Sequence, residues 1–274
     1  MFTLNCKGRL LVIQQPIVMG IINTTPDSFY SGSRINQVDD ALLRAERMLT
    51  DGAVVLDIGG QSTRPGSEQV GADEELKRVI PAIEAITARF PQAFISIDTF
   101  YAKVARAAIE AGADIVNDVS AGSIDDELLP TVAELKVPYV LMHMKGHPQT
   151  MQLNPVYDNV VTDVFDALNF KMAELIKTGI NDIIIDPGFG FGKSIQHNFQ
   201  LLKGLSYFQQ LQKPLLVGMS RKATVYKTLQ ITPGEALNGT TVLHTIALLN
   251  GAHMLRVHDV KEAVQAVTLC GAYQ

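Results

Sequence analysis

Residues 94–120 read FISIDTFYAKVARAAIEAGADIVNDVS, and this stretch decides the fold class. It begins with an apolar β-branched run, Phe94–Thr99, and ends with a second one, Asp114–Ser120. Between them lies a helical segment, Tyr101–Ala111, followed by Gly112, where a left-handed helix end favours glycine. Near-continuous apolar strands separated by a helix are typical of parallel strands covered on both faces. The stretch therefore predicts a βαβ unit of an α/β fold.

The same alternation extends along the whole chain. Eight strands are predicted, at Ile17–Asn23, Val54–Gly59, Phe94–Thr99, Asp114–Ser120, Tyr139–Met144, Asp182–Gly188, Pro214–Ser220 and His253–Asp259. The predicted helices include Glu74–Arg89, Tyr101–Ala111, Asp125–Lys136, Asn159–Thr178, Asn198–Leu211 and Leu237–Leu249. Residues 1–16 are predicted to form a short hairpin that turns at Lys7-Gly8 and covers one end of the sheet.

Two architectures fit this order, a (β/α)8 TIM barrel and an open doubly wound sheet. Polar residues at or just past the carboxyl ends of nearly all strands favour the barrel: Asn23, Asp57, Asp98, Asn117, His143, Asp186, Ser220, Arg256 and His258. An open sheet uses strand ends only at its switch point, whereas a barrel brings all eight ends to one mouth. We expect a (β/α)8 barrel with an N-terminal hairpin, and one domain over residues 1–274, because no repeat or linker-like composition interrupts the chain.

The composition limits the partners and the compartment. With 47% hydrophobic residues, 19% charged residues and a net charge of −5, the chain resembles an ordinary globular protein. It has no long Lys/Arg block, which argues against nucleic acid, and no apolar run long enough to span a membrane. Lys7 and Arg9 interrupt the apolar N-terminus, unlike a secretory signal. Because Cys6 and Cys270 are the two cysteines, we expect a cytoplasmic protein without disulfides.

Three carboxylates, Asp57, Asp98 and Asp186, fall within or at the ends of apolar strands. A buried carboxylate is costly without a partner, so each must meet a cation, an array of donors or a ligand. Asp57 is the one expected to be structural. Asp98 and Asp186, together with Asn117, offer acceptors that suit a heterocycle rich in N–H donors.

The glycine-rich stretch Pro187–Ser194, PGFGFGKS, does not match a phosphate-binding loop. The Walker pattern requires glycine where Pro187 stands, and the dinucleotide pattern requires glycine at Lys193. The spacing alone leaves two interpretations open, a structural turn and a wall that lets the backbone approach a flat ligand. In the second, Phe189 or Phe191 packs on that ligand.

The segments Ser220–Lys222 and Arg256–His258 end the seventh and eighth predicted strands. The loops after these strands are the usual phosphate site of barrels, so we expect an anion pocket there. A solvated surface charge is the alternative for Arg221. There is no HExxH or CxxC motif, so any metal is expected to be Mg²⁺, held by substrate phosphate, water and Asn23. No Ser-His-Asp or Cys-His arrangement suggests a protein nucleophile.

Eight blocks of the sequence, in order, resemble dihydropteroate synthase of folate biosynthesis. They are Met19–Phe29, Asp57–Gly66, Ser96–Thr99, Asn117–Gly122, Leu141–Met144, Asp186–Lys193, Gly218–Lys222 and Arg256–Val260. The resemblance implies a transferase that condenses 6-hydroxymethyl-7,8-dihydropterin pyrophosphate with 4-aminobenzoate, giving 7,8-dihydropteroate and pyrophosphate. It also implies a barrel fold, Mg²⁺ dependence, a homodimer and a target of sulfonamides.

Carried over position by position, the resemblance assigns roles to individual residues. It places Asn23 on the metal and implies catalytic roles for Asp98, Lys222, Arg256 and His258. The pterin pyrophosphate would be bound by Thr63, Asp98, Asn117, Met142, Asp186, Lys222, Arg256 and His258. The 4-aminobenzoate would be bound by Arg64, Pro65, Phe191, Ser220 and Lys222.

The chain departs from the family at Gln61, where Glu is common, at Ser31–Arg34 and at Lys145–His147. Two long loops, Thr24–Val38 and Gly60–Asp73, are expected to act as lids over the mouth. The alternatives are a pterin-binding methyltransferase module and a pterin binder without activity. The first has no pyrophosphate to expel, which counts against it because an anion pocket is predicted. The intact matched positions argue against the second.

Overall fold

The computed structural model describes residues 1–24, 34–61, 70–146 and 155–273. Their main sheet has eight parallel strands: β3 (Ile17–Asn23), β4 (Val55–Gly59), β5 (Phe94–Asp98), β6 (Ile115–Asp118), β7 (Tyr139–Met142), β8 (Ile183–Asp186), β9 (Leu216–Val217) and β10 (Met254–Val257). All eight lie where the sequence predicts a strand. The largest difference is β9, two residues instead of the predicted Pro214–Ser220, because the chain turns at Ser220 towards the next helix.

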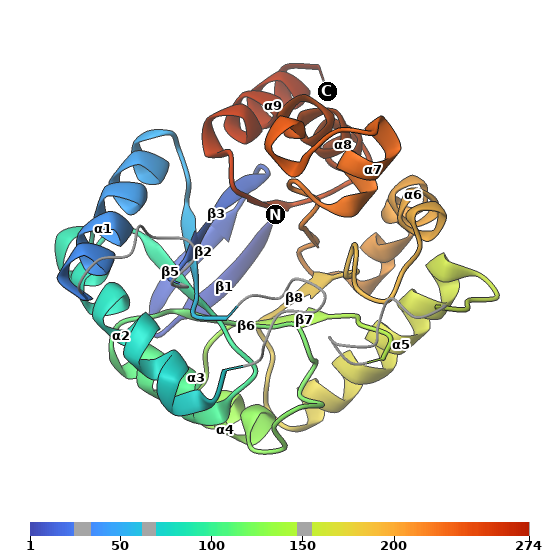
Figure 1. The fold of residues 1–274 in the computed structure, drawn as a ribbon. Coiled ribbons are helices and arrows are strands. Elements are labelled where there is room, and N and C mark those ends of the chain that lie inside the picture. The colour runs from blue at the N-terminus through green and yellow to red at the C-terminus, as the bar shows by residue number, and fades with distance from the viewer. Residues whose placement is uncertain (25–33, 62–69, 147–154, 274) are drawn as a thin grey trace.

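The sheet closes into a barrel. Its order is β8-β7-β6-β5-β4-β3-β10-β9, and the two outermost strands of this row meet at a parallel bridge between Ile185 and Leu215. The backbone N–H of Ile185 donates to the Pro214 carbonyl at 2.9 Å beside that bridge. The helices form a ring around the strands (Figure 1). The (β/α)8 barrel is confirmed, and the open doubly wound alternative is excluded.

Helices follow the strands around the outside of the barrel. They are α1 (Arg34–Thr50), α2 (Ala72–Arg89), α3 (Ala102–Glu110), α4 (Leu128–Leu135), α5 (Val160–Lys177), α6 (Ile195–Lys203), α7 (Ala223–Leu229), α8 (Leu237–Leu249) and α9 (Val260–Tyr273), with 3-10 turns η2 (Leu205–Leu211) and η3 (Pro233–Glu235). No helix among the described residues is long and apolar enough to cross a membrane.

Three sequence-based boundaries were wrong. The predicted single helix Asn198–Leu211 is α6 followed by η2, because Gly204 ends α6. The helix also starts earlier than predicted, since Ser194 and His197 form a capping box that fixes its first turn. The predicted loop Thr24–Val38 runs into α1, which already begins at Arg34.

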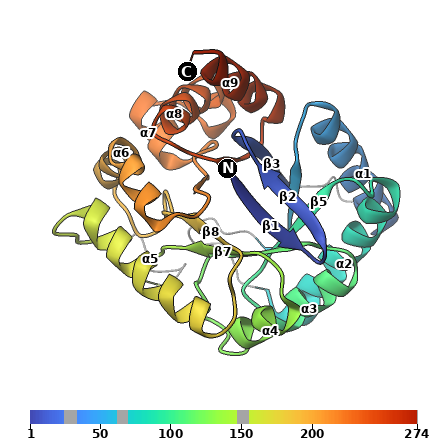
Figure 2. The same ribbon diagram turned by 180° about the vertical axis from the view of Figure 1, so that it is seen from behind.

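The N-terminal hairpin closes one end of the barrel, as predicted. Strands β1 (Phe2–Cys6) and β2 (Arg9–Ile13) pair antiparallel through a turn at Lys7 and Gly8, which have φ of 54° and 89°. Figure 2 shows the hairpin lying across the barrel end that faces the viewer. Its buried side chains Leu4, Cys6, Leu11 and Ile13 pack on residues near the starts of the strands, namely Ile17, Met19, Val55, Ile115, Val140, Ile184, Leu216 and Met254. The opposite end, where the strands finish, is therefore the mouth.

Candidate active site

Most of the predicted site residues lie at the carboxyl ends of the strands. Asp98 is paired in register with Asn117, and Met142 is paired with Asp186. These four side chains are buried, and Asn117, Met142 and Asp186 each stand two residues beyond an apolar residue of the layer that contacts the hairpin, so period-two alternation turns them to the same side. Asn23 ends β3 and is half-buried. The structure thus brings the predicted pterin-facing residues of β5, β6, β7 and β8 to one mouth.

Arg256 holds the centre of the polar layer. Its Nε donates to Asp57 Oδ2 at 2.6 Å and one terminal nitrogen donates to Asp98 Oδ2 at 2.6 Å. Asn117 Nδ2 donates to the same Asp57 oxygen at 3.1 Å. Asp57 is fully buried and acts as the structural partner that its sequence position predicts. Burial raises the pKa of the Asp98 carboxyl, and the Arg256 guanidinium opposes that rise.

Asp186 and Lys222 face each other across the glycine-rich loop. Asp186 Oδ1 accepts from the Gly188 N–H at 2.7 Å, and burial raises the pKa of this carboxyl. The Lys222 ammonium donates to the Phe189 carbonyl and lies 4.4 Å from the centre of the Phe191 ring. Burial lowers the pKa of Lys222 to about 8, and the Asp186 charge opposes that fall. A carboxylate and an ammonium therefore flank one flat surface.

Aromatic and thioether groups provide that surface. Met142 and Phe191 are buried and pack in one cluster with Phe100 and Val119. Flat apolar walls of this kind hold a ring, and convergent polar groups fix its orientation. Of the two aromatic side chains in the glycine-rich stretch, Phe191 packs beside Met142 at the end of β7 and Phe189 is buried in the main core, so Phe191 is the one placed to form a ligand wall.

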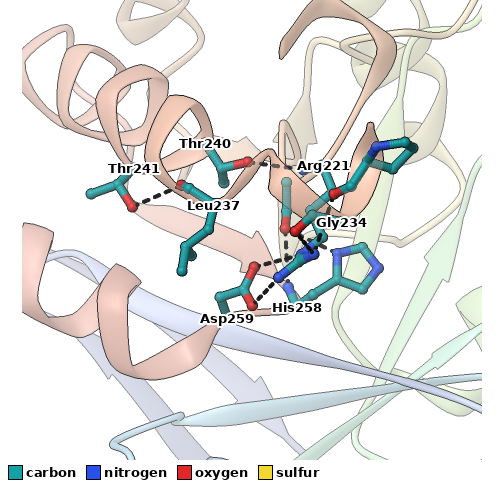
Figure 3. Close-up of polar contacts among 9 residues, drawn as sticks. Arg221, Gly234, Leu237, Thr240, Thr241, His258 and Asp259 are labelled. Atoms are coloured by element: carbon teal, nitrogen blue, oxygen red, sulfur yellow. Dashed lines mark hydrogen bonds and ion pairs between the residues drawn. The ribbon is translucent and has the colours of Figure 1, made fainter. Parts of the chain in front are cut away.

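The seventh and eighth strand ends are joined by two contacts. The Ser220 hydroxyl lies 2.9 Å from His258 Nδ1 and accepts from the His258 N–H at 3.2 Å. Arg221 donates two hydrogen bonds of 2.8 Å to the Asp259 carboxylate, from Nε and one terminal nitrogen. Its other terminal nitrogen donates to the Pro233 and Gly234 carbonyls (Figure 3). Arg221 is therefore part of an ion pair that links the two loops, and a solvated surface charge is the wrong reading.

The comparisons with known proteins match nearly the whole chain. The model of the family described as "Pterin binding enzyme" matches residues 19–258. Dihydropteroate synthase of Escherichia coli K12 is 44% identical over 268 residues, which are 97% of this chain and 94% of that protein. This chain belongs to the dihydropteroate synthase family of pterin-binding enzymes.

Solved structures of the family agree with the fold. A Yersinia pestis dihydropteroate synthase with a sulfonamide drug complex has a TM-score of 0.93 and 42% identity, covering 99% of each chain. A Xanthomonas albilineans dihydropteroate synthase with 4-aminobenzoic acid has a TM-score of 0.92 and 43% identity, covering 99% of this chain and 98% of that one. Likeness at this level extends over the barrel, the hairpin and the mouth.

Some predicted family residues lie outside the described residues. These are Thr63, Arg64 and Pro65 of the second predicted lid, most of the departure at Ser31–Arg34, and His147 of the departure at Lys145–His147. Gln61 is described, and it is buried. Its Nε2 donates to Glu75 Oε2 at 2.9 Å, so the departure from the family's Glu is accommodated by a buried carboxyl group on α2.

Sequence reasoning missed two buried ionisable groups beside the mouth. Glu75 accepts hydrogen bonds from Gln61 and Thr99, and burial raises its pKa to about 7. Lys193 lies beneath the glycine-rich loop, and burial lowers its pKa to about 7 while Asp186 opposes the fall. Glu75 carries no signal in the sequence, since it stands among the acidic residues of a helix start. Lys193 stands in the sequence at the end of a glycine-rich block that fits no phosphate-binding pattern, which gives no signal of a buried ammonium.

The metal-binding capacity of the mouth is small. The described residues contain no group of three or more His, Cys, Asp or Glu side chains placed to hold a metal ion. Asn23 supplies one side-chain oxygen at the end of β3. Its register partner on β4 is Gly59, which in turn is paired with Asp98 on β5. One neutral protein oxygen suits a hard cation that keeps most of its water and takes its other ligands from substrate phosphate. That pattern fits Mg²⁺ and does not fit a structural zinc site.

Proposed function

We propose that this chain catalyses the reaction of its family, the condensation of 6-hydroxymethyl-7,8-dihydropterin pyrophosphate with 4-aminobenzoate. The products are 7,8-dihydropteroate and pyrophosphate. The observation that carries the proposal is the mouth itself, where buried acceptors on β5, β6 and β8 face the cations Lys222 and Arg256. The family relationship supports the same reaction.

Acceptors at the mouth select the pterin. Its ring edge carries several N–H donors, which pair with Asp186, Asn117 and Asp98. One N–H of the Asn117 amide donates to Asp57 and fixes its orientation, and its oxygen is proposed to accept from the ligand. Met142 packs on the face of the ring. A ligand without these donors would leave buried carboxylates unpaired, which is the physical source of selectivity.

Arg256 and His258 assist departure of pyrophosphate. When the bond between the methylene carbon and the pyrophosphate oxygen breaks, the electron pair leaves with the oxygen. Arg256 uses Nε and one terminal nitrogen on Asp57 and Asp98, so among the described residues its other terminal nitrogen is available to that oxygen. A fixed cation aimed where charge develops lowers the barrier without reorganisation. His258, exposed just after β10, is proposed to extend the same anion pocket, and Thr63, outside the described residues, is proposed as a further pyrophosphate ligand.

Asp98 stabilises the carbon left behind. Loss of pyrophosphate makes the methylene cationic and conjugated with the pterin ring, and a carboxylate beside it offsets that charge. The amine of 4-aminobenzoate then forms the new carbon–nitrogen bond and releases one proton. No bond to the protein forms at any stage, which accounts for the absence of a nucleophile motif in the sequence. Phe191, Lys222 and Ser220, with Arg64 and Pro65, are proposed to hold the 4-aminobenzoate.

Mg²⁺ is proposed as the cofactor, with Asn23 as its protein ligand. When bound, the ion would neutralise charge on the pyrophosphate. Asn23 lies at the end of β3, and one strand, β4, separates it from Asp98 on β5. Its role can be tested apart from turnover, because Asn23→Leu should weaken binding of magnesium pyrophosphate measured by calorimetry. Equal affinity in both proteins would remove Asn23 from the metal site.

A homodimer is proposed from the exposed face of α8. Val242, Ile246 and Leu249 are spaced at helical intervals and are 50%, 38% and 47% exposed. A stripe of this kind is covered when a second copy packs the same face against it. Sedimentation velocity should show a dimer for the natural chain and a monomer for Ile246→Glu. A monomer for both would contradict the proposal.

The proposed compartment is the cytoplasm. Cys6 and Cys270 are both free and buried. Burial raises the pKa of Cys6 to about 12, so this group stays a protonated, unreactive thiol. A buried free thiol of this kind suits a reducing compartment. Cell fractionation with an antibody against the chain tests the location.

The experiment that tests the activity is formation of dihydropteroate from the two substrates with Mg²⁺, followed by chromatography. The expected result is a product that contains both the pterin and the aminobenzoate. A chain that binds the pterin and forms no product would be the binder without activity. Methyl transfer to or from a pterin would instead indicate the methyltransferase alternative.

A further inference from the structure

The lysine that follows the glycine-rich loop is buried beneath that loop. Lys193 is only 2% exposed, and its ammonium donates to the carbonyls of Gly188 at 2.9 Å, Phe191 at 3.0 Å and His143 at 3.3 Å. His143 Nδ1 lies 3.0 Å away, and burial with the Lys193 charge lowers the pKa of this imidazole to about 3. A neutral imidazole can accept a hydrogen bond. Among the described residues, the ammonium therefore contacts four acceptors and no carboxylate.

The backbone around this ammonium is tightly coiled. Gly188, Gly190 and Gly192 have φ of 72°, 81° and 62°, a region that favours glycine. A Cβ on Gly188 would overlap the His143 carbonyl, and one on Gly192 would overlap the Lys145 carbonyl. The glycines allow the loop carbonyls to turn inward, and carbonyl dipoles turned towards one point need a cation there.

The outer side of the loop contributes to the mouth. Phe191 packs with Met142, and the Lys222 ammonium lies over its ring. Lys222 also donates to the Phe189 carbonyl of the same loop. Two ammonium groups therefore contact this loop. Lys193 binds two loop carbonyls and the His143 carbonyl of a second segment, whereas Lys222 binds the Phe189 carbonyl alone.

We propose that Lys193 is a positioning residue, whose buried ammonium keeps residues 187–192 in the shape that presents Phe191 to the substrates. It does so independently of Lys222, which can leave Phe189 to contact a substrate while the wall stays in place. The inference rests on the proposed function only for the identity of the substrates. The shape of the loop can be measured without them.

Hydrogen exchange of the loop amides tests this division of roles. The N–H groups of Gly188, Gly190 and Phe191 donate to Asp186 Oδ1, Asn198 Oδ1 and the Gly188 carbonyl. In Lys193→Met, exchange of these amides should be faster by about tenfold or more, since local opening sets their protection. In Lys222→Met, exchange should stay near that of the natural chain. Lys203→Met, at the exposed end of α6, is the matched control and should change nothing.

Substrate binding provides the second readout. In folded Lys193→Met, the KM for 4-aminobenzoate should rise by about tenfold or more, and kcat should fall less, because a displaced wall weakens ground-state binding. Lys193→Gln, which keeps an amide donor, should lie between the two proteins and replaces the methionine variant if that one does not fold. Natural exchange rates in a folded Lys193 variant, or equal acceleration in Lys222→Met, would overturn the proposal. If the natural chain makes no dihydropteroate, the proposed function fails, and the exchange comparison still decides the role of Lys193.

Discussion

Arg256 and Asp57 are joined by a bond of 2.6 Å between Nε and Oδ2, although they stand 199 residues apart in the chain. Asp57 is fully buried and Arg256 keeps 19% of its side chain exposed, so the pair reaches from the barrel core to the mouth. A carboxylate that holds one side of a guanidinium also fixes where the remaining N–H groups of that guanidinium point. The proposed anion pocket is therefore anchored in the barrel core by a contact that runs from β4 to β10 across the intervening β3.

Replacing Arg256 by lysine should reduce kcat/KM by a factor on the order of 100, as expected when a donor to developing negative charge is lost. A lysine carries one nitrogen and cannot contact Asp57, Asp98 and pyrophosphate in the fork geometry of a guanidinium. Steady-state kinetics measures the loss. Arg106→Lys, at an exposed ion pair with Glu134, is the control and should leave kcat/KM unchanged. Near-natural kcat/KM for Arg256→Lys would mean that Arg256 has only a structural role.

Asp186→Ala should weaken pterin binding by about tenfold to a hundredfold, equivalent to roughly 1.5–3 kcal/mol for a lost charged hydrogen-bond partner. Titration calorimetry with a pterin analogue measures the change. Asp182→Ala, just before the other end of the same strand, serves as the control and should bind normally. If the folded Asp186→Ala chain keeps its full affinity, the pterin edge lies elsewhere.

Glu75 should make the free energy of unfolding fall as pH rises from about 5 to 8. Its folded pKa of about 7 lies above the ordinary value of 4.5 for a glutamate, so within that window the folded state holds more protons than the unfolded state. Glu75→Gln removes this dependence, so its stability relative to the natural chain should rise with pH by up to about 3 kcal/mol. Denaturant unfolding at both pH values measures the slope. A difference that does not change with pH would show that Glu75 is ionised throughout.

Gln61→Glu should destabilise the fold at pH 8 and much less at pH 5. The substitution replaces a donor, 2.9 Å from Glu75, by a second carboxyl group in a buried site, where two like charges repel. Thermal unfolding at the two pH values is the measurement. The double variant with Glu75→Gln restores one amide and one carboxyl group and should recover most of the stability. Additive losses in the double variant would mean that the two side chains do not interact.

The fold could be predicted because its signals are local. Apolar runs with polar ends define the strands, and the site residues of β5, β6 and β8 follow from where those runs stop. Partners are non-local, and no spacing in the sequence places Asp57 under Arg256 or Glu75 beside Gln61. Arg256 and Lys222 could be singled out from their places at the ends of predicted strands, and the family resemblance added their expected roles, whereas Lys193 required coordinates, because the same glycine-rich pattern suits a turn or a wall. The single domain over residues 1–274 and the functional roles of all the predicted site residues, with Thr63, Arg64 and Pro65 among them, stay predictions.

The most direct test of the proposed function is release of pyrophosphate from the pterin substrate with and without 4-aminobenzoate. In the presence of Mg²⁺, sustained release over many turnovers should require 4-aminobenzoate and match dihydropteroate formation one for one, because the amine traps the cation that would otherwise recombine with pyrophosphate. Arg256→Lys should slow both products equally. Pyrophosphate release at the same rate without 4-aminobenzoate, or no release with it, would contradict the assignment of this chain as a dihydropteroate synthase.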